Sequence, residues 1–304
     1  MRLLFFATGE FALPSLERLK REGFDIQAVI SAPRKPKGRG LKPIPSPVSI
    51  KAKELGLPLI ETPEPNSEAS IQEFKGYKPD YGIVIDYRFI LKTPLLSLFR
   101  YGCIGVHPSL LPLYRGAAPI QRSIMEGATK TGVSVFLMDE GIDSGPILLQ
   151  KETEIKPEET FGELRTRLSL IGAELLCDAL KGIESLKPIP QDDSRATYAH
   201  KLQKEERLID WKKPAKDIVN LIRALSPTPL AYTRFREKRV EIYQARERDI
   251  MGTPGLIIPE RGSLVIGALK GGVEVLRLKV EGRSIISGRD FINGYRPKQE
   301  EHFY

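Results

Sequence analysis

The fold of this chain is decided by residues 103–119, which read CIGVHPSLLPLYRGAAP. A short run of apolar and small residues ends at His107, and a loop rich in proline begins directly after it. A strand that runs into a loop is how open α/β sheets place reactive side chains at the carboxyl ends of their strands. Imidazole titrates near neutral pH, which suits proton transfer. This stretch therefore predicts an α/β sheet with a histidine at the carboxyl end of a strand, which is either a group for proton transfer or an ordinary core or surface residue.

Outward from this stretch, short apolar strands alternate with helical patterns. Strands are predicted at Leu3–Phe6, Asp25–Ile30, Tyr81–Ile85, Ile104–His107 and Gly132–Leu137. Helices are predicted at Phe11–Glu22, Ser46–Leu55, Pro119–Glu126 and Thr160–Lys181. Such alternation is typical of a mostly parallel, Rossmann-like open sheet.

The last third of the chain has a different pattern. Residues 186–195 read LKPIPQDDSR, a polar, proline-bearing stretch that suits an inter-domain linker. Beyond it, one helix is predicted at Pro214–Leu225. Short strands follow at Ala231–Arg236, Val240–Gln244, Gly255–Ile258, Ser263–Gly267 and Val273–Val280. This spacing predicts a small, OB-like β-barrel. We therefore expect a domain at residues 1–184, a linker at 185–203 and a β-barrel domain at 204–304.

Composition and charge narrow the class of protein. No apolar run reaches 18 residues, and the chain begins directly with an apolar strand pattern, so neither a membrane span nor a signal peptide is expected. The two cysteines, in apolar contexts, predict reduced, buried thiols and a cytoplasmic protein. Residues 201–304 carry 21 basic and 14 acidic side chains, a net +7 of the total +8. This asymmetry indicates a polyanionic partner such as nucleic acid; solubility alone is the alternative.

A second loop offers carboxylates that could orient the imidazole. Residues 138–146 read MDEGIDSGP and contain Asp139, Glu140 and Asp143. A histidine with a carboxylate partner is suited to accepting and passing on a proton.

At these two loops the chain resembles the folate-dependent formyltransferases. The pattern of that family is Asn-x-His-x-Ser-Leu-Leu-Pro followed by Arg-Gly, and later Met-Asp-x-Gly-x-Asp-x-Gly. The resemblance implies formyl transfer from 10-formyltetrahydrofolate to an amine, with no metal. His107 would contact the oxyanion and shuttle protons, and Asp143 would hold and charge the imidazole. The folate-contacting loop would consist of Ser109, Leu110, Leu111 and Pro112.

The C-terminal third resembles the branch of this family that formylates methionyl initiator tRNA. The segments TYAHKL at residues 197–202 and FINGY at residues 291–295 match that branch. The resemblance thus covers the whole chain and implies a tRNA-binding barrel in a cytoplasmic protein, which we expect to be a monomer.

One catalytic position departs from the family pattern. The asparagine two residues before the histidine is Gly105 here, which has no amide to donate to the oxyanion. Loss of one oxyanion donor typically slows turnover about 100- to 1000-fold. Three readings stay open: a low-activity form, another donor or a water in the gap, or a protein that binds without catalysis. We expect Gly105→Asn to raise turnover roughly 100-fold, and no gain would indicate that another group already fills the role or that the catalytic geometry is lost.

Two further departures lie near the expected folate pocket. Where the family has Ala-Tyr-Gly, this chain has Asp86, Tyr87 and Arg88. Asp86 and Arg88 could pair with each other or meet the pterin or the glutamate tail of folate. In the opening turn, ATGEFA at residues 7–12, Phe11 is retained and is assigned to the substrate side. The turn lacks the glycine spacing of a dinucleotide site.

A basic segment interrupts the first domain. Between Ala32 and Lys53 lie seven basic and no acidic residues. Its glycines and prolines predict a mobile loop without regular structure in its first half. The resemblance assigns this loop to the tRNA acceptor stem, and its residues are Arg34, Lys35, Lys37, Arg39 and Lys42.

The function predicted from sequence is formyl transfer to methionyl initiator tRNA. A formyltransferase that acts on an amino sugar is a rival, against which the basic loop and basic barrel argue. A catalytically impaired RNA- or folate-binding relative is a second rival, favoured by Gly105, Asp86 and Arg88.

Overall fold

The computed structural model describes residues 1–37, 42–258, 260, 262–298 and 300–304. The chain divides into two compact units. Unit 1 comprises residues 1–116, 131–153 and 165–198, and unit 2 comprises residues 117–130, 154–164 and 199–304. Within the predicted linker at 185–203, residues up to Tyr198 fall in unit 1 and residues from Ala199 fall in unit 2.

The first sheet has seven strands in the order β5-β2-β1-β6-β7-β8-β9. The strands are β1 (Arg2–Ala7), β2 (Asp25–Ser31), β5 (Leu59–Glu61), β6 (Tyr81–Ile85), β7 (Cys103–His107), β8 (Lys130–Leu137) and β9 (Ile147–Glu154). Neighbouring strands from β5 to β7 are parallel, whereas β7 and β8 are antiparallel. The predicted open, mostly parallel sheet is confirmed, although β5 and β9 were not predicted.

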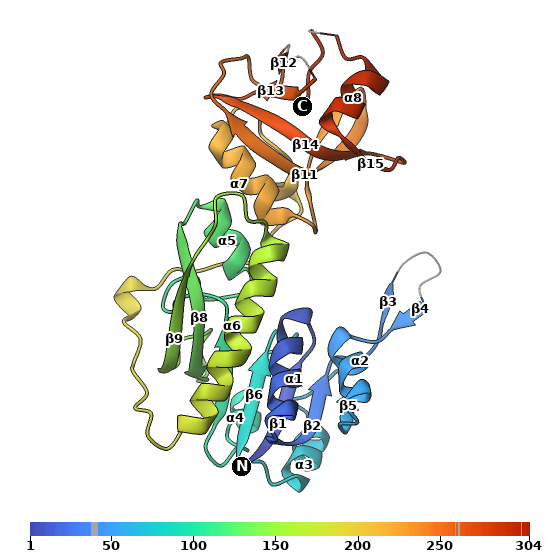
Figure 1. Ribbon diagram of the computed structural model, residues 1–304. Coiled ribbons are helices and arrows are strands. Elements are labelled where there is room, and N and C mark those ends of the chain that lie inside the picture. The colour runs from blue at the N-terminus through green and yellow to red at the C-terminus, as the bar shows by residue number, and fades with distance from the viewer. Residues whose placement is uncertain (38–41, 259, 261, 299) are drawn as a thin grey trace. The chain divides into compact units, whose positions relative to one another are not determined.

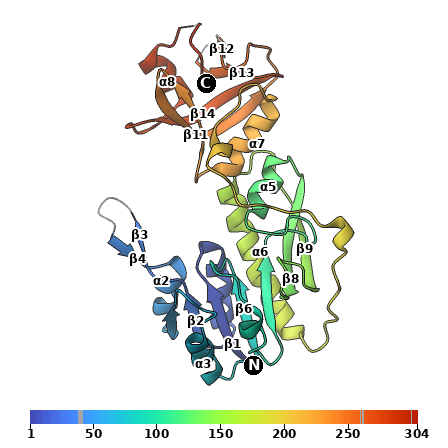
Figure 2. The same ribbon diagram turned by 180° about the vertical axis from the view of Figure 1, so that it is seen from behind.

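Helices cover both faces of this sheet. A 3₁₀ turn (Glu10–Ala12) leads into α1 (Leu13–Arg21), followed by α2 (Pro47–Glu54), α3 (Glu68–Gly76), α4 (Thr93–Leu96) and α6 (Phe161–Gly182), whereas α5 (Pro119–Met125) belongs to unit 2. Seen from opposite sides, α1 and α6 lie on one face of the sheet, and α3 and α4 lie on the other (Figures 1 and 2). Under α3 and α4, Phe6 packs edge-on against Phe74 and Phe99 in a buried apolar cluster. This packing fixes β1, β6 and β7, whose carboxyl ends carry the candidate site.

The basic segment is more ordered than its composition predicted. β3 (Lys35–Lys37) and β4 (Lys42–Ile44) form an antiparallel hairpin. The register pairs Pro36 with Pro43, so the two residues that lack an N–H group share one position of the ladder. The prediction of no regular structure here was wrong for these strands. Arg39 lies outside the described residues.

The second sheet belongs to unit 2 and is antiparallel. Its path is β10-β11-β14-β13-β12, with β15 paired to β14, which makes an open, half-barrel sheet rather than a closed barrel. The elements of this part are α7 (Ala215–Leu225), β10 (Ala231–Phe235), β11 (Lys238–Arg248), β12 (Ile257–Ile258), β13 (Leu264–Gly267), β14 (Gly272–Val280), β15 (Ile285–Ser287) and α8 (Gly288–Tyr295); two 3₁₀ turns, Asp193–Arg195 and Glu205–Arg207, precede them.

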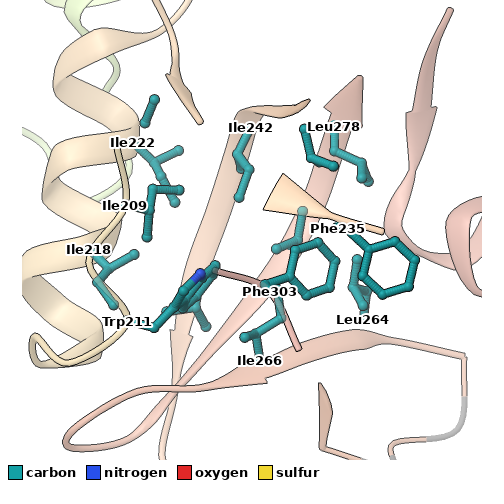
Figure 3. Close-up of a cluster of buried hydrophobic side chains, with 14 of the residues drawn as sticks. Ile209, Trp211, Ile218, Ile222, Phe235, Ile242, Leu264, Ile266, Leu278 and Phe303 are labelled. Carbon is teal, nitrogen blue, oxygen red and sulfur yellow. The ribbon is translucent and has the colours of Figure 1, made fainter. Parts of the chain in front are cut away.

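A buried aromatic and aliphatic core holds this half-barrel together. Ile218 and Ile222 of α7 face the strands, and Trp211 lies beneath them (Figure 3). The Trp211 indole donates a hydrogen bond to Thr233 Oγ1 at 2.9 Å, so its buried polar atom is satisfied. Phe235 stacks on Phe303 with ring centroids 4.9 Å apart, which binds the end of the chain into the core.

One buried carboxylate in the half-barrel generates a stability prediction. Glu274 on β14 accepts from Arg246 Nε at 2.8 Å and from Arg248 Nη1 at 2.7 Å across the ladder. These guanidinium groups hold the pKa of the Glu274 carboxyl at about 2, below its usual 4.5. A lowered folded-state pKa stabilises the fold above about pH 4.5, and this stabilisation is lost as the pH falls toward 2.

Glu274→Gln should therefore lower the free energy of unfolding by about 1–2 kcal/mol at pH 7, a value reduced because the arginines stay partly exposed. Urea unfolding at pH 7 and pH 3 measures this, and the difference from the unaltered protein should shrink at pH 3. Glu247→Gln, an exposed neighbour on β11, is the control. Equal effects of the two substitutions at pH 7 would contradict the assignment.

Candidate active site

The two motif loops meet at the carboxyl edge of the first sheet. His107 is the last residue of β7 and is buried. Its Nε2 lies 2.8 Å from the carbonyl oxygen of Tyr114, and its Nδ1 lies 3.5 Å from Asp143 Oδ2. Because a carbonyl only accepts, Nε2 carries the proton in this contact, and Nδ1 is the nitrogen that faces the carboxylate. The arrangement suits a ring that gains and releases a proton at Nδ1.

Asp143 is held in place by backbone and side-chain contacts. Its Oδ2 accepts the Gly116 N–H at 2.8 Å, so the Arg-Gly motif orients the carboxylate. Asp143 has φ +51°, a left-handed conformation that side chains rarely adopt and that persists only where its surroundings fix it. Gln191 supplies that restraint, since its Nε2 donates to the carbonyl of Asp143 at 2.9 Å and to that of Gly145 at 2.7 Å.

Gln191 is in turn held by a buried arginine. Arg115 donates to Gln191 Oε1 from Nε at 3.0 Å and from Nη2 at 2.8 Å, and its Nη2 also contacts Asp193 at 2.7 Å. Arg115 is only 3% exposed, so these partners offset the cost of burying its charge. Sequence reasoning assigned Gln191 and Asp193 to a linker and missed this role. The arginine of the Arg-Gly motif could have indicated this role, because a buried arginine requires acidic or amide partners.

The expected folate loop is tightly braced from within the protein. Ser109 is fully buried and donates to the Leu113 carbonyl at 2.5 Å, while Leu111 is also buried. Ser134 and Gln150 hydrogen-bond to the backbone of Ser109 and Leu111. Leu110 packs against β8, where a Cβ on Gly132 would lie 2.5 Å from it. Contacts to a folate would therefore come from partly exposed Leu110 and Pro112 or from the backbone.

The side chain of Phe136 lies where a side chain at position 105 would be. Gly105 lies opposite Phe136 in the β7–β8 ladder. A Cβ at position 105 would stand 2.5 Å from Phe136 Cε1 and 2.7 Å from its Cζ. The Phe136 ring thus fills the space of a side chain at position 105. Gly105→Asn was expected to act alone, and this expectation needs correction, because the new side chain overlaps the Phe136 ring unless that ring shifts or is removed.

Asp86 and Arg88 do not pair among the described residues. The Asp86 carboxylate lies against Gly9 and accepts the Phe11 N–H at 3.4 Å, whereas the Arg88 guanidinium lies 5.7 Å from the Phe89 ring centroid. Desolvation by the surrounding protein raises the pKa of the Asp86 carboxyl, although the residue keeps access to solvent. The Phe11 ring is buried, so only its backbone faces this group.

The basic hairpin follows β2 in unit 1. Arg34 is exposed and lies 3.8 Å from Glu61. The strands carry the backbone of Lys35, Lys37 and Lys42. Among the described residues, no cluster of histidine, cysteine or acidic side chains could hold a metal ion, and no helix is long and apolar enough to cross a bilayer.

Both parts of the chain match known formyl transferase sequences. Residues 1–180 match the family model described as formyl transferase, and residues 201–296 match that of the formyl transferase C-terminal domain. The chain is 42% identical over 300 residues to the methionyl-tRNA formyltransferase of Syntrophus aciditrophicus, covering 97% of this chain and 96% of that one. It is 41% identical over 308 residues to the enzyme of that name from Carboxydothermus hydrogenoformans, covering 100% and 99%.

A solved structure has the same fold. The methionyl-tRNA formyltransferase from Clostridium thermocellum superposes with a TM-score of 0.61 at 18% identity, covering 95% of this chain and all of that one. This similarity supports the arrangement of an open parallel sheet followed by an antiparallel half-barrel.

The packing of Gly105 against Phe136 generates the second prediction. Gly105→Asn alone should give no gain in turnover and should lower stability by about 1–3 kcal/mol, because the added side chain overlaps the ring. The double variant Gly105→Asn/Phe136→Ala should raise turnover roughly 100-fold, because an amide donor then has space beside His107. Turnover and thermal unfolding are measured for both.

Phe136→Ala is the matched control and should be destabilised by about 3–5 kcal/mol without a gain in turnover. If Gly105→Asn alone raises turnover as far as the double variant does, the ring is not the obstacle.

Proposed function

The chain belongs to the formyltransferase family, and we propose that it transfers the formyl group of 10-formyltetrahydrofolate to the amino group of methionyl initiator tRNA. The observation that carries this proposal is identity of about 40% to methionyl-tRNA formyltransferases over nearly the full length of both chains. The match to the C-terminal domain and the basic character of residues 201–304 support an RNA substrate.

The residues at the sheet edge fit a folate donor in part. One buried hydroxyl near this end of the sheet, Tyr87 OH, has no hydrogen-bond partner among the described residues. The braced loop from Ser109 to Pro112 and the exposed Arg88 are assigned to the folate side. The missing amide at Gly105 is the point where the fit departs from the family pattern.

The chemistry assigned to His107 and Asp143 is proton transfer during attack of the amine. As the amine nitrogen bonds to the formyl carbon, the carbonyl oxygen gains negative charge and the nitrogen must lose a proton. His107 Nδ1, with Asp143 beside it, takes that proton. The proton then passes to the nitrogen of the departing folate as its bond to the formyl carbon breaks. A protonated His107 also stabilises the developing oxyanion.

Unit 1 is assigned the catalysis, while the hairpin of unit 1 and the half-barrel of unit 2 are assigned to tRNA. We further propose a cytoplasmic monomer. Formyl transfer assayed with methionyl initiator tRNA and with a nucleotide-linked amino sugar tests the acceptor. Preferred formylation of the amino sugar would favour the rival enzyme class.

The catalytic pair generates the third prediction. His107→Ala and Asp143→Ala should each lower turnover by at least about 100-fold, because each removes part of the proton path. Circular dichroism should show an intact fold, and binding of methionyl-tRNA should persist. Asp139→Ala, in the same loop, is the control and should keep most of the activity. A folded His107→Ala protein with unchanged turnover would refute the assignment.

The basic hairpin generates the fourth prediction. Replacing Arg34, Lys35, Lys37, Arg39 and Lys42 with glutamine should weaken tRNA binding, because fewer phosphates are neutralised. The slope of log affinity against log salt should fall by up to about 0.9 for each phosphate that the protein no longer neutralises. Folate binding should persist, since its loop lies elsewhere in the unit. Filter-binding titrations at several salt concentrations measure both effects.

A control variant carries the same change in charge at the other end of the strands. Its positions lie just before β2, β6 and β7, at the amino ends of the parallel strands. Its five exposed positions are Lys20, Arg21, Lys75, Lys78 and Arg100. Equal loss of affinity in the two variants would show that only net charge matters and that the hairpin has no specific role.

A further inference from the structure

Asp86 occupies the topological switch point of the first sheet. From β1 the chain runs outward to β2 and β5, and then returns to the other side of β1 to form β6. Ligands of open α/β sheets bind at the carboxyl ends of the strands on either side of such a switch. Asp86 is the residue that follows β6 at this edge. The β6–β7 register pairs Val84 with Gly105, so Asp86 lies at the level of His107, one strand away.

The backbone at Asp86 is fixed in an unusual conformation. Its φ is +47°, in the left-handed region, and its carbonyl accepts the N–H groups of Thr8 and Gly9, each at 3.1 Å. The carboxyl then lies over Gly9, where any Cβ would stand 1.8 Å from Asp86 Oδ2. Only a glycine at position 9 leaves room for the Asp86 carboxylate in this orientation, so the Asp86 conformation depends on Gly9.

The protein leaves most of the hydrogen-bonding capacity of this carboxylate unused. Its Oδ2 accepts one long hydrogen bond from Phe11 N, and among the described residues Oδ1 has no donor and the group has no ion-pair partner. Burial raises the pKa of the Asp86 carboxyl. The charge of Arg165 lowers this pKa and the charge of Glu10 raises it. Arg165 and Glu10 form an ion pair with each other at 2.6 Å. Asp86 is exposed to solvent, so its unused oxygen is open to a ligand at the switch point of the sheet.

The direction of the carboxylate separates it from the folate loop. The expected folate loop follows β7, whereas Asp86 turns toward β1, over Gly9 and onto the backbone of Phe11. Phe11 is the residue of this turn that was assigned from the sequence to the substrate side. The orphaned Thr8 hydroxyl belongs to the same turn. These neighbours associate Asp86 with the acceptor side of the site.

We propose that Asp86 is an acceptor-recognition residue whose carboxylate binds the positively charged α-amino group of the aminoacyl substrate. This inference rests on the proposed function and assigns a role to a residue that departs from the family pattern. An α-amino group has a pKa near 8, so it carries a positive charge at neutral pH and pairs with a carboxylate. Bound at Asp86, one strand from His107, the ammonium group first releases one proton to solvent. The free amine then attacks the formyl carbon, and His107 takes the proton that the nitrogen loses in that step.

The test uses Asp86→Asn, which keeps the size of the side chain over Gly9 and tolerates the left-handed backbone but removes the charge. Dissociation constants are measured for methionyl-tRNA and for the same tRNA without its amino acid. All interactions with the body of the tRNA are common to the two probes, so the ratio of the constants isolates the aminoacyl end. Folinic acid is titrated separately as a folate probe. Glu64→Gln, an exposed carboxylate after β5 at the same edge of the sheet, is the control.

The unaltered protein should prefer methionyl-tRNA over uncharged tRNA, and Asp86→Asn should reduce this preference about ten-fold while its affinity for folinic acid stays the same. Glu64→Gln should retain the preference. An unchanged preference in Asp86→Asn, or a loss confined to folinic acid, would overturn the inference. These outcomes are distinct from failure of the proposed function, in which the unaltered protein itself neither prefers charged tRNA nor formylates it.

Discussion

A hydrogen-bond chain from Arg115 through Gln191 to the backbone of Asp143 is the constraint on which the candidate site depends. It fixes a left-handed residue in an exposed loop and so keeps a carboxylate 3.5 Å from Nδ1 of His107. Without the amide of Gln191, the carbonyls of Asp143 and Gly145 would lack this donor, and the hydrogen bond from the Gly116 N–H to the Asp143 carboxylate would remain. The segment after α6 therefore serves the active site as well as connecting two parts of the chain.

At two positions of the candidate site, a neighbouring side chain fills the space next to a glycine. At Gly105 a side chain is absent and the Phe136 ring occupies its space; at Gly9 a side chain is absent and the Asp86 carboxylate occupies its space. The first exchange removes a polar group near His107, and the second adds a charged group one strand away. Both glycine positions are therefore filled by a neighbouring side chain of this protein.

The strand and helix periodicities predicted most of the first sheet because buried parallel strands read as continuous apolar runs. They did not predict β9, whose exposed Lys151 and Glu152 break that pattern, nor the hairpin at Lys35–Lys37, where prolines argued for irregular structure. His107 and Asp143 were found because both sit in long motifs. Gln191 and Phe136 were not, because their roles arise from interactions across 48 and 31 residues of sequence that no local pattern encodes.

Formyl transfer by this chain has to proceed without the amide that Gly105 lacks. Single-turnover transfer from 10-formyltetrahydrofolate to methionyl-tRNA, with the enzyme in excess and both substrates saturating, tests directly whether it does. We expect all of the bound methionyl-tRNA to become formylated in one exponential phase. Both substrates bound to a folded protein with no formylated product would contradict this expectation and would identify a binding protein that has no formyltransferase chemistry.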